Sequence, residues 1–331
     1  MAPIIVPIDL GSSKEISWRV AMKPAGKTLL VASTGGHLAQ LVRLEGGLGL
    51  SRDSVYLTFR SPQSESLLRG RRVVYAPYIK PRGFLAIVRT AFIVFKLFRA
   101  EKFDSCVSTG AGIALAAIPL ARVLGLSTLY IESVSRTSGP SLTGRIIALL
   151  RVADLRTQHR AWETNRWKYR GDVLDVYESY ATSSSTNEPS VLVSLGTIRP
   201  YRFDSLVDAV LTSGIANSST TWQLGCTDRS GLPGVSHKQI DAKGFEALAL
   251  HADVVITHAG VGTILQLLEM GKYPIVAVRR RARNEHVDDH QEQISELLSR
   301  HNLARVVEAP DLSVEDIHLV RARRVRKSSS V

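Results

Sequence analysis

Cysteine is scarce in this chain, and its two copies, Cys106 and Cys226, fall in different predicted halves of the sequence. A disulfide framework is therefore not expected, and a reducing compartment such as the cytoplasm is the default. No group of Cys and His residues has the spacing of a structural zinc site. The sequence thus predicts domains that are held together by their own apolar cores.

Long apolar runs are absent as well. No run reaches the roughly 18 uncharged apolar residues of a membrane span. The apolar stretch at residues 4–10 contains Pro7 and Asp9 and has no basic segment before it, so we do not expect a signal peptide. Residues 1–25 are expected to form a flexible extension, with Met22 as an alternative start.

Positive charge dominates only one part of the chain. Residues 1–182 contain 25 Lys and Arg against 13 Asp and Glu, so they carry the whole net charge of +12, whereas residues 183–331 contain 17 of each kind. Such asymmetry indicates that the first half faces an anionic partner. Nucleic acid is one such partner, but the chain has no nucleic-acid-binding motif. We therefore expect an anionic membrane surface and no nucleic acid.

A glycine turn between a strand and a helix is the most informative local pattern. The β-branched run VVIT (residues 254–257) predicts a buried strand, and HAGVGT (258–263) follows it. An apolar helix then ends at Gly271, and PIVAV (274–278) predicts the next strand. In such a βαβ unit the helix N-terminus directs free N–H groups at the turn, which suits a diphosphate.

The same design recurs along the chain. Glycine turns follow the predicted strands TLLVA, SCVS and VLVSL, which begin at Thr28, Ser105 and Val191. The turn after the first of these strands, TGGH, is not G-x-G-x-x-G, which argues against a nicotinamide cofactor. Alternating strands and helices predict an α/β protein with parallel sheets.

Composition predicts the domain boundaries. A polar linker occupies residues 181–190 (ATSSSTNEPS), so we place one Rossmann-like domain at 26–180 and a second at 191–318. Residues 319–331 are strongly basic and are expected to form a disordered tail.

A helix of unusual character is predicted at residues 84–99 (FLAIVRTAFIVFKLFR). Arg82, Arg89 and Lys96 recur every seven residues and form one basic stripe, while most other positions are apolar. One interpretation is a buried crossover helix. The alternative is a helix that lies in the membrane interface with its cations near lipid phosphates.

Several segments together resemble one enzyme class. They are TGGH (residues 34–37), YIESVSRTSGPSLTGR (130–145), HAGVGT (258–263) and DDHQ (288–291). They resemble GT-B glycosyltransferases, and especially the two-subunit eukaryotic enzyme that adds the second GlcNAc to dolichol-diphosphate-GlcNAc. The chain looks like a fusion of both subunits. It is also similar to bacterial capsule and exopolysaccharide transferases and to the peptidoglycan GlcNAc transferase.

The resemblance implies a GT-B fold, in which two Rossmann-like domains face a central cleft. It implies an inverting transfer of a sugar, such as GlcNAc, from a UDP-sugar to a polyprenyl-diphosphate-linked acceptor in cell-surface polysaccharide biosynthesis. The enzyme would work peripherally on the cytoplasmic face of the plasma membrane.

No Asp-x-Asp pair occurs in the chain, so we expect no metal and no cofactor. Helix N-termini, backbone N–H groups and Arg199 or Arg202 would then stabilise the leaving diphosphate.

The resemblance also implies which residues bind the donor. They are Gly196, Thr197, Phe245, His258, Gly260, Gly262, Thr263, Gln266, His290 and Gln291. The family usually has Glu where this chain has Gln266, at the position that binds the ribose hydroxyls. Glutamine can still accept a hydrogen bond, but without charge. Glu269, one turn later, is either a structural helix residue or a substitute.

The acceptor hydroxyl needs a general base, and two residues are candidates. His37 comes first, because imidazole takes a proton readily near neutral pH. Glu132 comes second, unless it is a buried residue paired with Arg136. The residues implied for the acceptor diphosphate are Gly35, Gly36, Gly110, Gly112 and Arg136.

Two other functions stay open at this point. A UDP-sugar 2-epimerase shares the fold and needs no lipid. A non-catalytic membrane-docking scaffold is the third hypothesis, which Gln266 slightly favours and the intact glycine motifs oppose.

Overall fold

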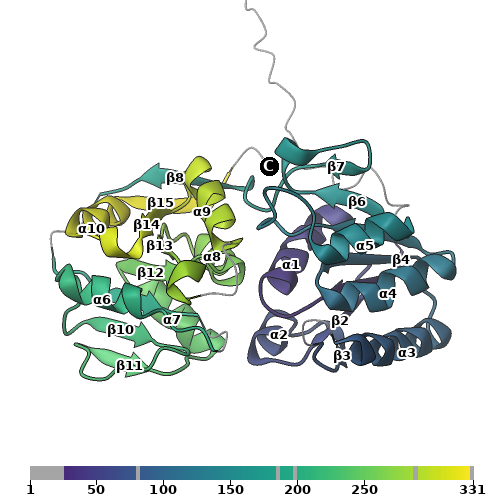
Figure 1. Ribbon diagram of the computed structural model, residues 1–331, viewed down its shortest axis with the longest axis horizontal. Helices are drawn as coiled ribbons and strands as arrows, with labels where there is room; N and C mark the ends of the chain where they lie inside the picture. Colours follow the sequence, from purple (N-terminus) through teal and green to yellow (C-terminus); the bar gives the residue numbers. More distant parts are fainter. Residues whose placement is uncertain (1–25, 80–82, 184–186, 197–199, 286–289, 329–331) are drawn as a thin grey trace, which may run out of the picture.

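The structure is a computed structural model that describes residues 26–79, 83–183, 187–196, 200–285 and 290–328. The predicted extension, residues 1–25, lies outside these ranges. The chain forms two α/β domains side by side, each built on a parallel sheet (Figure 1). The predicted fold class is therefore confirmed.

The first domain contains a seven-stranded sheet in the order β3-β2-β1-β4-β5-β6-β7. Its strands are β1 (Thr28–Ala32), β2 (Val55–Phe59), β3 (Arg72–Ala76), β4 (Ser105–Gly110), β5 (Ser127–Ile131), β6 (Asp154–Thr157) and β7 (Trp167–Tyr169). The strand order reverses between β1 and β4, which pair in parallel. Ligands of doubly wound sheets bind at such a switch point, beyond the carboxyl ends of the strands.

Helices cover both faces of this sheet. One face packs against α1 (Gly36–Leu48) and α2 (Pro62–Leu67). The other face packs against α3 (Phe84–Ala100), α4 (Gly112–Val123) and α5 (Leu142–Leu150). The predicted helix at residues 84–99 thus exists, but it is only half covered. Val94 and Thr90 are buried, whereas Phe84 and Leu85 are 72% and 76% exposed.

The second domain contains a six-stranded sheet in the order β11-β10-β9-β12-β13-β14. Its strands are β9 (Val191–Ser194), β10 (Thr220–Gln223), β11 (Val235–His237), β12 (Val254–His258), β13 (Ile275–Val278) and β14 (Arg305–Glu308). Its helices are α6 (Asp204–Thr212), α7 (Ala242–His251), α8 (Val261–Glu269), α9 (His290–Arg300) and α10 (Val314–Arg321). Short 3₁₀ turns occupy Arg160–Trp162, Arg281–Arg283 and Ala309–Asp311.

The predicted disorder of the tail from residue 319 is wrong for the described residues up to 328. Helix α10 continues to Arg321, and β15 (Arg323–Lys327) pairs antiparallel with β8 (Tyr177–Ala181). Val325 is buried, and Arg326 Nε donates to Glu178 Oε1 at 2.7 Å. The basic composition of this segment suggested disorder because the sequence does not show that β8, with Glu178, lies beside it.

The predicted linker at residues 181–190 also does not mark where the chain changes domain. Val173, Leu174 and Tyr177 are already buried in the core of the second domain, together with Val191 and Val193. The crossing therefore comes directly after β7. The physical reason is the burial of these three apolar side chains, which fixes residues 173–177 to the second domain before the polar segment begins.

Candidate functional site

A cleft of about 1360 Å³ lies between the two domains. Its walls are the loops that follow β1, β2, β3 and β4 in the first domain and β10, β11 and β12 in the second. The carboxyl ends of both sheets therefore open into one cavity, as Rossmann-like ligand sites do.

Three of the helices that begin at this cleft follow a strand directly and have no side-chain cap, and α3, which begins after Gly83, is uncapped as well. The N-cap residues are Gly35 for α1, Ala111 for α4 and Gly260 for α8. By contrast, Asp241 caps α7 through the N–H of Gly244. The N–H groups at the first three helix starts thus remain available for an anion.

Ala111 marks the α4 turn as unusual, because its φ of 65° and ψ of 175° are a conformation that only glycine adopts freely. Backbone strain of this kind clusters at ligand sites. Sequence reasoning missed this residue, since an alanine between two glycines carries no signal of strain.

The glycine turns of the two domains touch each other. A Cβ placed on Gly36 would lie 3.0 Å from the Val261 Cβ. A Cβ placed on Gly262 would lie 3.3 Å from Gln63 Nε2 and 3.6 Å from the Gly35 carbonyl carbon. The turns predicted for donor and acceptor are therefore adjacent across the domain interface.

His37 is held in one tautomer. Its Nδ1 lies 2.7 Å from the Thr109 carbonyl oxygen, and Thr109 Oγ1 donates to the His37 carbonyl at 2.8 Å. A carbonyl only accepts, so Nδ1 carries the proton and Nε2 keeps its lone pair. Burial holds the pKa of His37 below its ordinary value of 6.5, so the ring is neutral at pH 7. A Cβ on Gly110 would lie 3.0 Å from His37 Cε1, so this position must be glycine.

Glu132, the second candidate base, is fully buried and already engaged. Its carboxylate accepts from the backbone N–H and hydroxyl of Ser141, at 2.8 and 3.0 Å, and from the Ser133 N–H at 3.2 Å. It has no ion pair with Arg136 within the described part of the chain. The geometry therefore favours His37 as the base and Glu132 as the anchor of the 132–141 loop.

Arg136 belongs to the loop that Glu132 anchors. Its N–H donates to the Ser133 carbonyl at 2.9 Å, and its own carbonyl accepts from Trp162 Nε1 at 2.8 Å. Its charge is among the factors that lower the pKa of His37. Arg136 thus lies in the same neighbourhood as the candidate base.

Gln40 and Gln63 support the site, and sequence reasoning missed both. Gln40 is fully buried, and its Oε1 accepts from Val134 N and Gln158 Nε2, both at 2.8 Å. Gln63 Oε1 accepts from the Gly35 N–H at 2.6 Å. The local sequence does not predict that such a glutamine is buried, because its hydrogen-bond partners lie far away along the chain.

The donor side is partly assembled in the cleft. Gly262, Thr263, Gln266 and Phe245 line it. Glu269 instead bonds Arg43 Nη2 of α1 at 2.6 Å. Gln266 thus lies in the cleft, and its ribose role stays a prediction, whereas Glu269 is a structural link between the domains.

The other predicted donor residues that the structure describes do not line this cleft. The His258 ring packs against Gly260, whose added Cβ would lie 2.5 Å from Nε2. Gly196 packs against Arg279, and Gln291 is buried in the first turn of α9. Thr197, Arg199 and the side chain of His290 lie outside the described residues.

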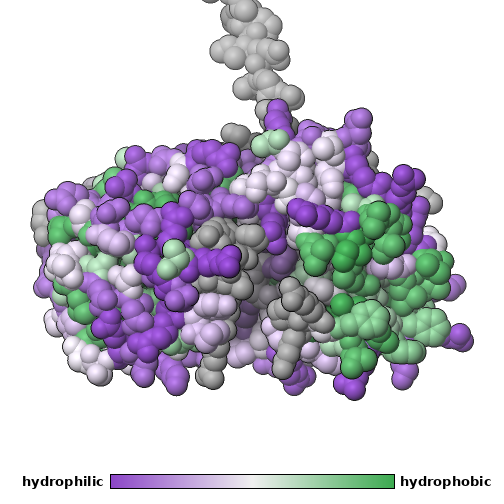
Figure 2. Space-filling view, viewed as in Figure 1, coloured by the Kyte–Doolittle hydropathy of each residue, from purple (hydrophilic) through white to green (hydrophobic). Residues whose placement is uncertain are grey.

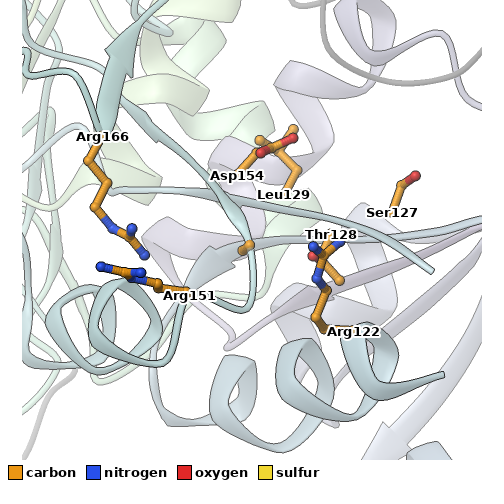
Figure 3. Close-up of a pocket in the computed structure, with 8 residues that line it drawn as sticks. Arg122, Ser127, Thr128, Leu129, Arg151, Asp154 and Arg166 are labelled. Carbon is orange, nitrogen blue, oxygen red and sulfur yellow. The ribbon is translucent and has the colours of Figure 1, made fainter. Parts of the chain in front are cut away.

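A second cavity, of about 200 Å³, lies at the amino-terminal edge of the first sheet (Figure 3). Its cations come from Arg122 in the last turn of α4, Arg151 after α5, and Arg166 before β7. Arg166 Nη2 donates to the Ala148 carbonyl near the end of α5. Cations near helix C-termini interact favourably with the helix dipole, which gives these arginines a structural role.

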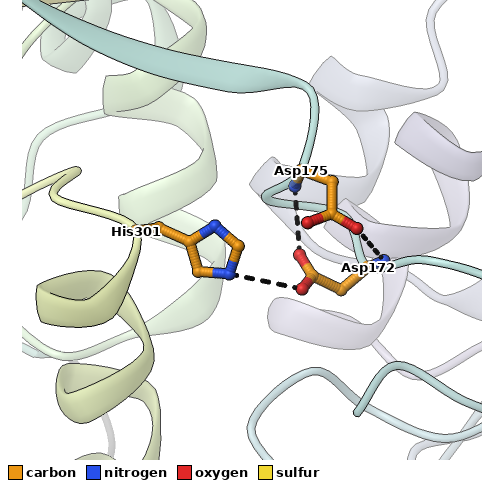
Figure 4. Close-up of side chains that lie close together, drawn as sticks. All are labelled: Asp172, Asp175 and His301. Atoms are coloured by element: carbon orange, nitrogen blue, oxygen red, sulfur yellow. Dashed lines mark hydrogen bonds and ion pairs between the residues drawn. The ribbon is translucent and has the colours of Figure 1, made fainter. Parts of the chain in front are cut away.

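The domains are also joined where the chain crosses between them (Figure 4). His301 Nε2, just after α9, lies 3.4 Å from Asp172 Oδ2, while Asp172 Oδ1 accepts from the Leu174 and Asp175 N–H groups. The Asp172 carboxylate raises the pKa of His301, with a smaller contribution from Asp175, while burial and Arg300 act the opposite way. The pair is a titratable contact between the domains.

His301→Gln should therefore lower stability in a pH-dependent way. A histidine whose pKa is raised by folding stabilises the protein fully below about pH 6.5, and this effect is lost as pH rises through the folded-state value. We expect the variant to melt about 1–3 °C below wild type at pH 6 and at the same temperature at pH 9. Differential scanning calorimetry measures both; an equal deficit at the two pH values would exclude the ion pair as its cause.

Comparison with known proteins supports this architecture. Residues 239–326 match the Glycosyltransferase family 28 C-terminal domain. The UDP-N-acetylglucosamine transferase subunit ALG13 of Yarrowia lipolytica is 32% identical over 126 residues, in a match that covers 33% of this chain and 60% of that protein. This chain thus spans less than two thirds of that relative's length.

Solved structures extend the likeness to both domains. MurG of Acinetobacter baumannii matches with a TM-score of 0.53 and 16% identity, over 88% of this chain and 89% of that one. The UDP-GlcNAc 2-epimerase of Methanocaldococcus jannaschii matches with a TM-score of 0.53 and 11% identity, over 89% and 91%. At these identities the likeness shows the fold alone.

The fold is therefore GT-B, and the predicted resemblance to GT-B glycosyltransferases is confirmed. Within that class, the second domain is similar to the C-terminal domain of glycosyltransferase family 28.

Proposed function

We propose that this protein is an inverting, metal-independent glycosyltransferase that moves a sugar such as GlcNAc from UDP to a polyprenyl-diphosphate-linked acceptor. The observation that carries the proposal is the contact between the Gly35–Gly36 turn and the Gly262 turn, which places two uncapped helix N-termini side by side. Each suits one diphosphate: the donor's at α8 and the acceptor's at α1.

The base lies on the acceptor side of this contact. His37 follows Gly36 directly, and its Nε2 carries the free lone pair. It would take the proton of the acceptor hydroxyl as the hydroxyl attacks the anomeric carbon, while UDP departs toward α8. Inversion follows because a single displacement changes the configuration once.

The acceptor end of the cleft is apolar, which supports a lipid-linked substrate. Phe84 and Ile87 of α3, Leu115 of α4, and Leu142 and Ile146 of α5 line it. Phe84 and Leu142 are also exposed on the outer surface, at 72% and 73%. A prenyl chain could therefore extend from the cleft onto this surface along apolar side chains only.

That outer surface is the proposed membrane-docking face. Apolar side chains gather on it over α3, α4 and α5 (Figure 2). Its exposed members are Phe84, Leu85, Val88, Phe92, Phe95, Val123, Leu124, Leu142, Leu149 and Leu150. Arg89, Lys96 and Arg99 of α3 and Arg122 and Arg151 at its far edge add positive charge. No helix of the described chain is long and apolar enough to cross a bilayer, so docking would be interfacial.

The double variant Leu85→Ser/Phe92→Ser should lose membrane binding. Both side chains are more than 60% exposed, so the fold should tolerate the change, and neither lines the cleft. We expect at least a tenfold drop in co-flotation with phosphatidylglycerol-containing vesicles, since each large apolar side chain contributes about 1.5–3 kcal/mol when fully buried. Leu211→Ser, at an exposed position of α6 in the other domain, is the matched control and should float like wild type. Equal flotation of all three proteins would refute the docking face.

EDTA should leave turnover unchanged. The chain has no Asp-x-Asp pair, and the single cluster of metal-ligating side chains in the described residues is Asp172, Asp175 and His301, at the domain crossing. Initial rates measured with EDTA and with added Mg²⁺ or Mn²⁺ should agree within about twofold. Loss of turnover with EDTA that either metal restores would contradict the proposed leaving-group stabilisation.

One assay separates the transferase from its two alternatives. UDP release and the isomer of the remaining UDP-sugar are both measured over a panel of UDP-sugars, with and without a polyprenyl-diphosphate-linked acceptor. A transferase releases UDP only with acceptor present, whereas an epimerase converts the UDP-sugar without lipid and a scaffold does neither. The epimerase has a similar fold, but the apolar side chains at the acceptor end of the cleft would have no role in a reaction without lipid.

A further inference from the structure

A buried arginine lies behind one predicted donor turn. Arg279 follows β13 and is only 1% exposed. Within the described residues, its Nε and Nη2 have no hydrogen-bond partner. Its neighbours differ: Arg280 pairs with Glu292 and Glu308, whereas Arg279 has no ion pair in the described part of the chain.

The surroundings of Arg279 do not balance its charge. The Phe203 ring centroid lies 5.1 Å from Cζ, which provides a cation–π contact. Glu285 acts on the guanidinium from a distance, but its carboxylate is already bound by Ser205, Arg283 and the Arg280 N–H. A buried cation without a partner destabilises a protein by more than one cation–π contact returns. Something absent from the polypeptide alone is therefore expected to balance it.

The position of Arg279 indicates what that is. A Cβ on Gly196 would lie 2.6 Å from Nη1 and 2.8 Å from Nη2, so the guanidinium packs directly against this glycine. Gly196 lies two residues after β9, which pairs in parallel with β12 so that Ser194 lies opposite Thr257. Gly196 and the start of α8 therefore follow neighbouring strands at the same edge of the sheet.

We propose that Arg279 is the cation that holds the diphosphate of the donor nucleotide, acting across the single glycine between it and the ligand. This inference rests on the proposed function and adds to it a residue that lies outside the cleft lining and outside every motif of the sequence. It also gives Gly196 a physical role: any side chain there would displace the guanidinium.

Arg279→Met and Arg279→Lys test this pair of claims, because both keep a long flexible side chain and only one keeps the charge. Calorimetric titration with UDP should show affinity about 10- to 100-fold weaker for the methionine variant and within a few-fold of wild type for the lysine variant. Uridine, which has no phosphate, should bind all three proteins alike. Arg300→Met, at the exposed C-terminal end of α9, is the control and should bind UDP like wild type.

Thermal melting without ligand excludes a merely structural role. Removing an unbalanced buried charge should leave the melting temperature of Arg279→Met equal to or above that of wild type. A lower melting temperature with equal losses of UDP and uridine affinity would overturn the inference, as would unchanged UDP affinity.

Inorganic pyrophosphate separates this inference from the proposed function. If wild type fails to bind UDP, the donor assignment is wrong. Stabilisation of wild type but not Arg279→Met by pyrophosphate would then still support the anion site, and no stabilisation of wild type would overturn it.

Discussion

His37→Ala should lower kcat by about 10²–10⁴-fold, the usual contribution of general-base catalysis. The structure explains why. The Thr109 carbonyl fixes the proton on Nδ1, and burial keeps the ring neutral, so Nε2 is ready to accept a proton. UDP affinity should barely change, because His37 lies on α1 of the acceptor half. Steady-state kinetics with saturating donor and acceptor measure the effect.

Two variants separate catalysis from binding. His37→Gln keeps a polar side chain but has no basic nitrogen, so it should be nearly as slow as alanine. If it instead raises the acceptor KM and leaves kcat near normal, His37 only shapes the turn. If Glu132→Gln abolishes kcat and the His37 variants do not, Glu132 is the base. In wild type, kcat/KM should decline only below pH 6.5, because the pKa of His37 lies under its ordinary value.

Gly262→Val should strongly weaken donor binding while the fold stays intact. The valine Cβ would lie 3.3 Å from Gln63 Nε2, and its two methyl groups would extend further into the space between the glycine turns. Displacing a diphosphate from a helix N-terminus removes charge-assisted hydrogen bonds, each worth about 1.5–3 kcal/mol, so UDP affinity should fall by about 10- to 100-fold or more.

The control for Gly262→Val is Gly46→Val on α1, where an added Cβ meets nothing within 4 Å. Both variants should keep a native circular dichroism spectrum, and the control should bind UDP like wild type. Unchanged UDP binding by Gly262→Val would remove this turn from the donor site.

Local patterns in the sequence were enough to predict the strands and glycine turns around the site. The run at residues 254–257 and the glycines after it correspond to β12 and the start of α8, because a buried parallel strand and an uncapped helix both leave signatures in adjacent residues. The acceptor turn at β1 and α1 is predictable for the same reason.

Contacts between distant segments were not predictable. The basic strand Arg323–Lys327 needs β8, which lies far upstream, and composition alone made it look disordered. The role of Glu269 depends on Arg43 of the other domain. Arg279 belongs to no motif, and only its burial against Gly196 draws attention to it. Each case depends on a contact with a residue that is distant in the sequence, and local sequence patterns do not show such contacts.

The central claim is sugar transfer onto a lipid-linked acceptor with His37 as the base. Mass spectrometry of the acceptor after incubation with UDP-GlcNAc tests it most directly, with wild type and His37→Gln compared at equal concentration. The account predicts that wild type adds one sugar residue to the acceptor and releases one UDP, while the variant adds almost none. An acceptor of unchanged mass beside an isomerised UDP-sugar would contradict the account.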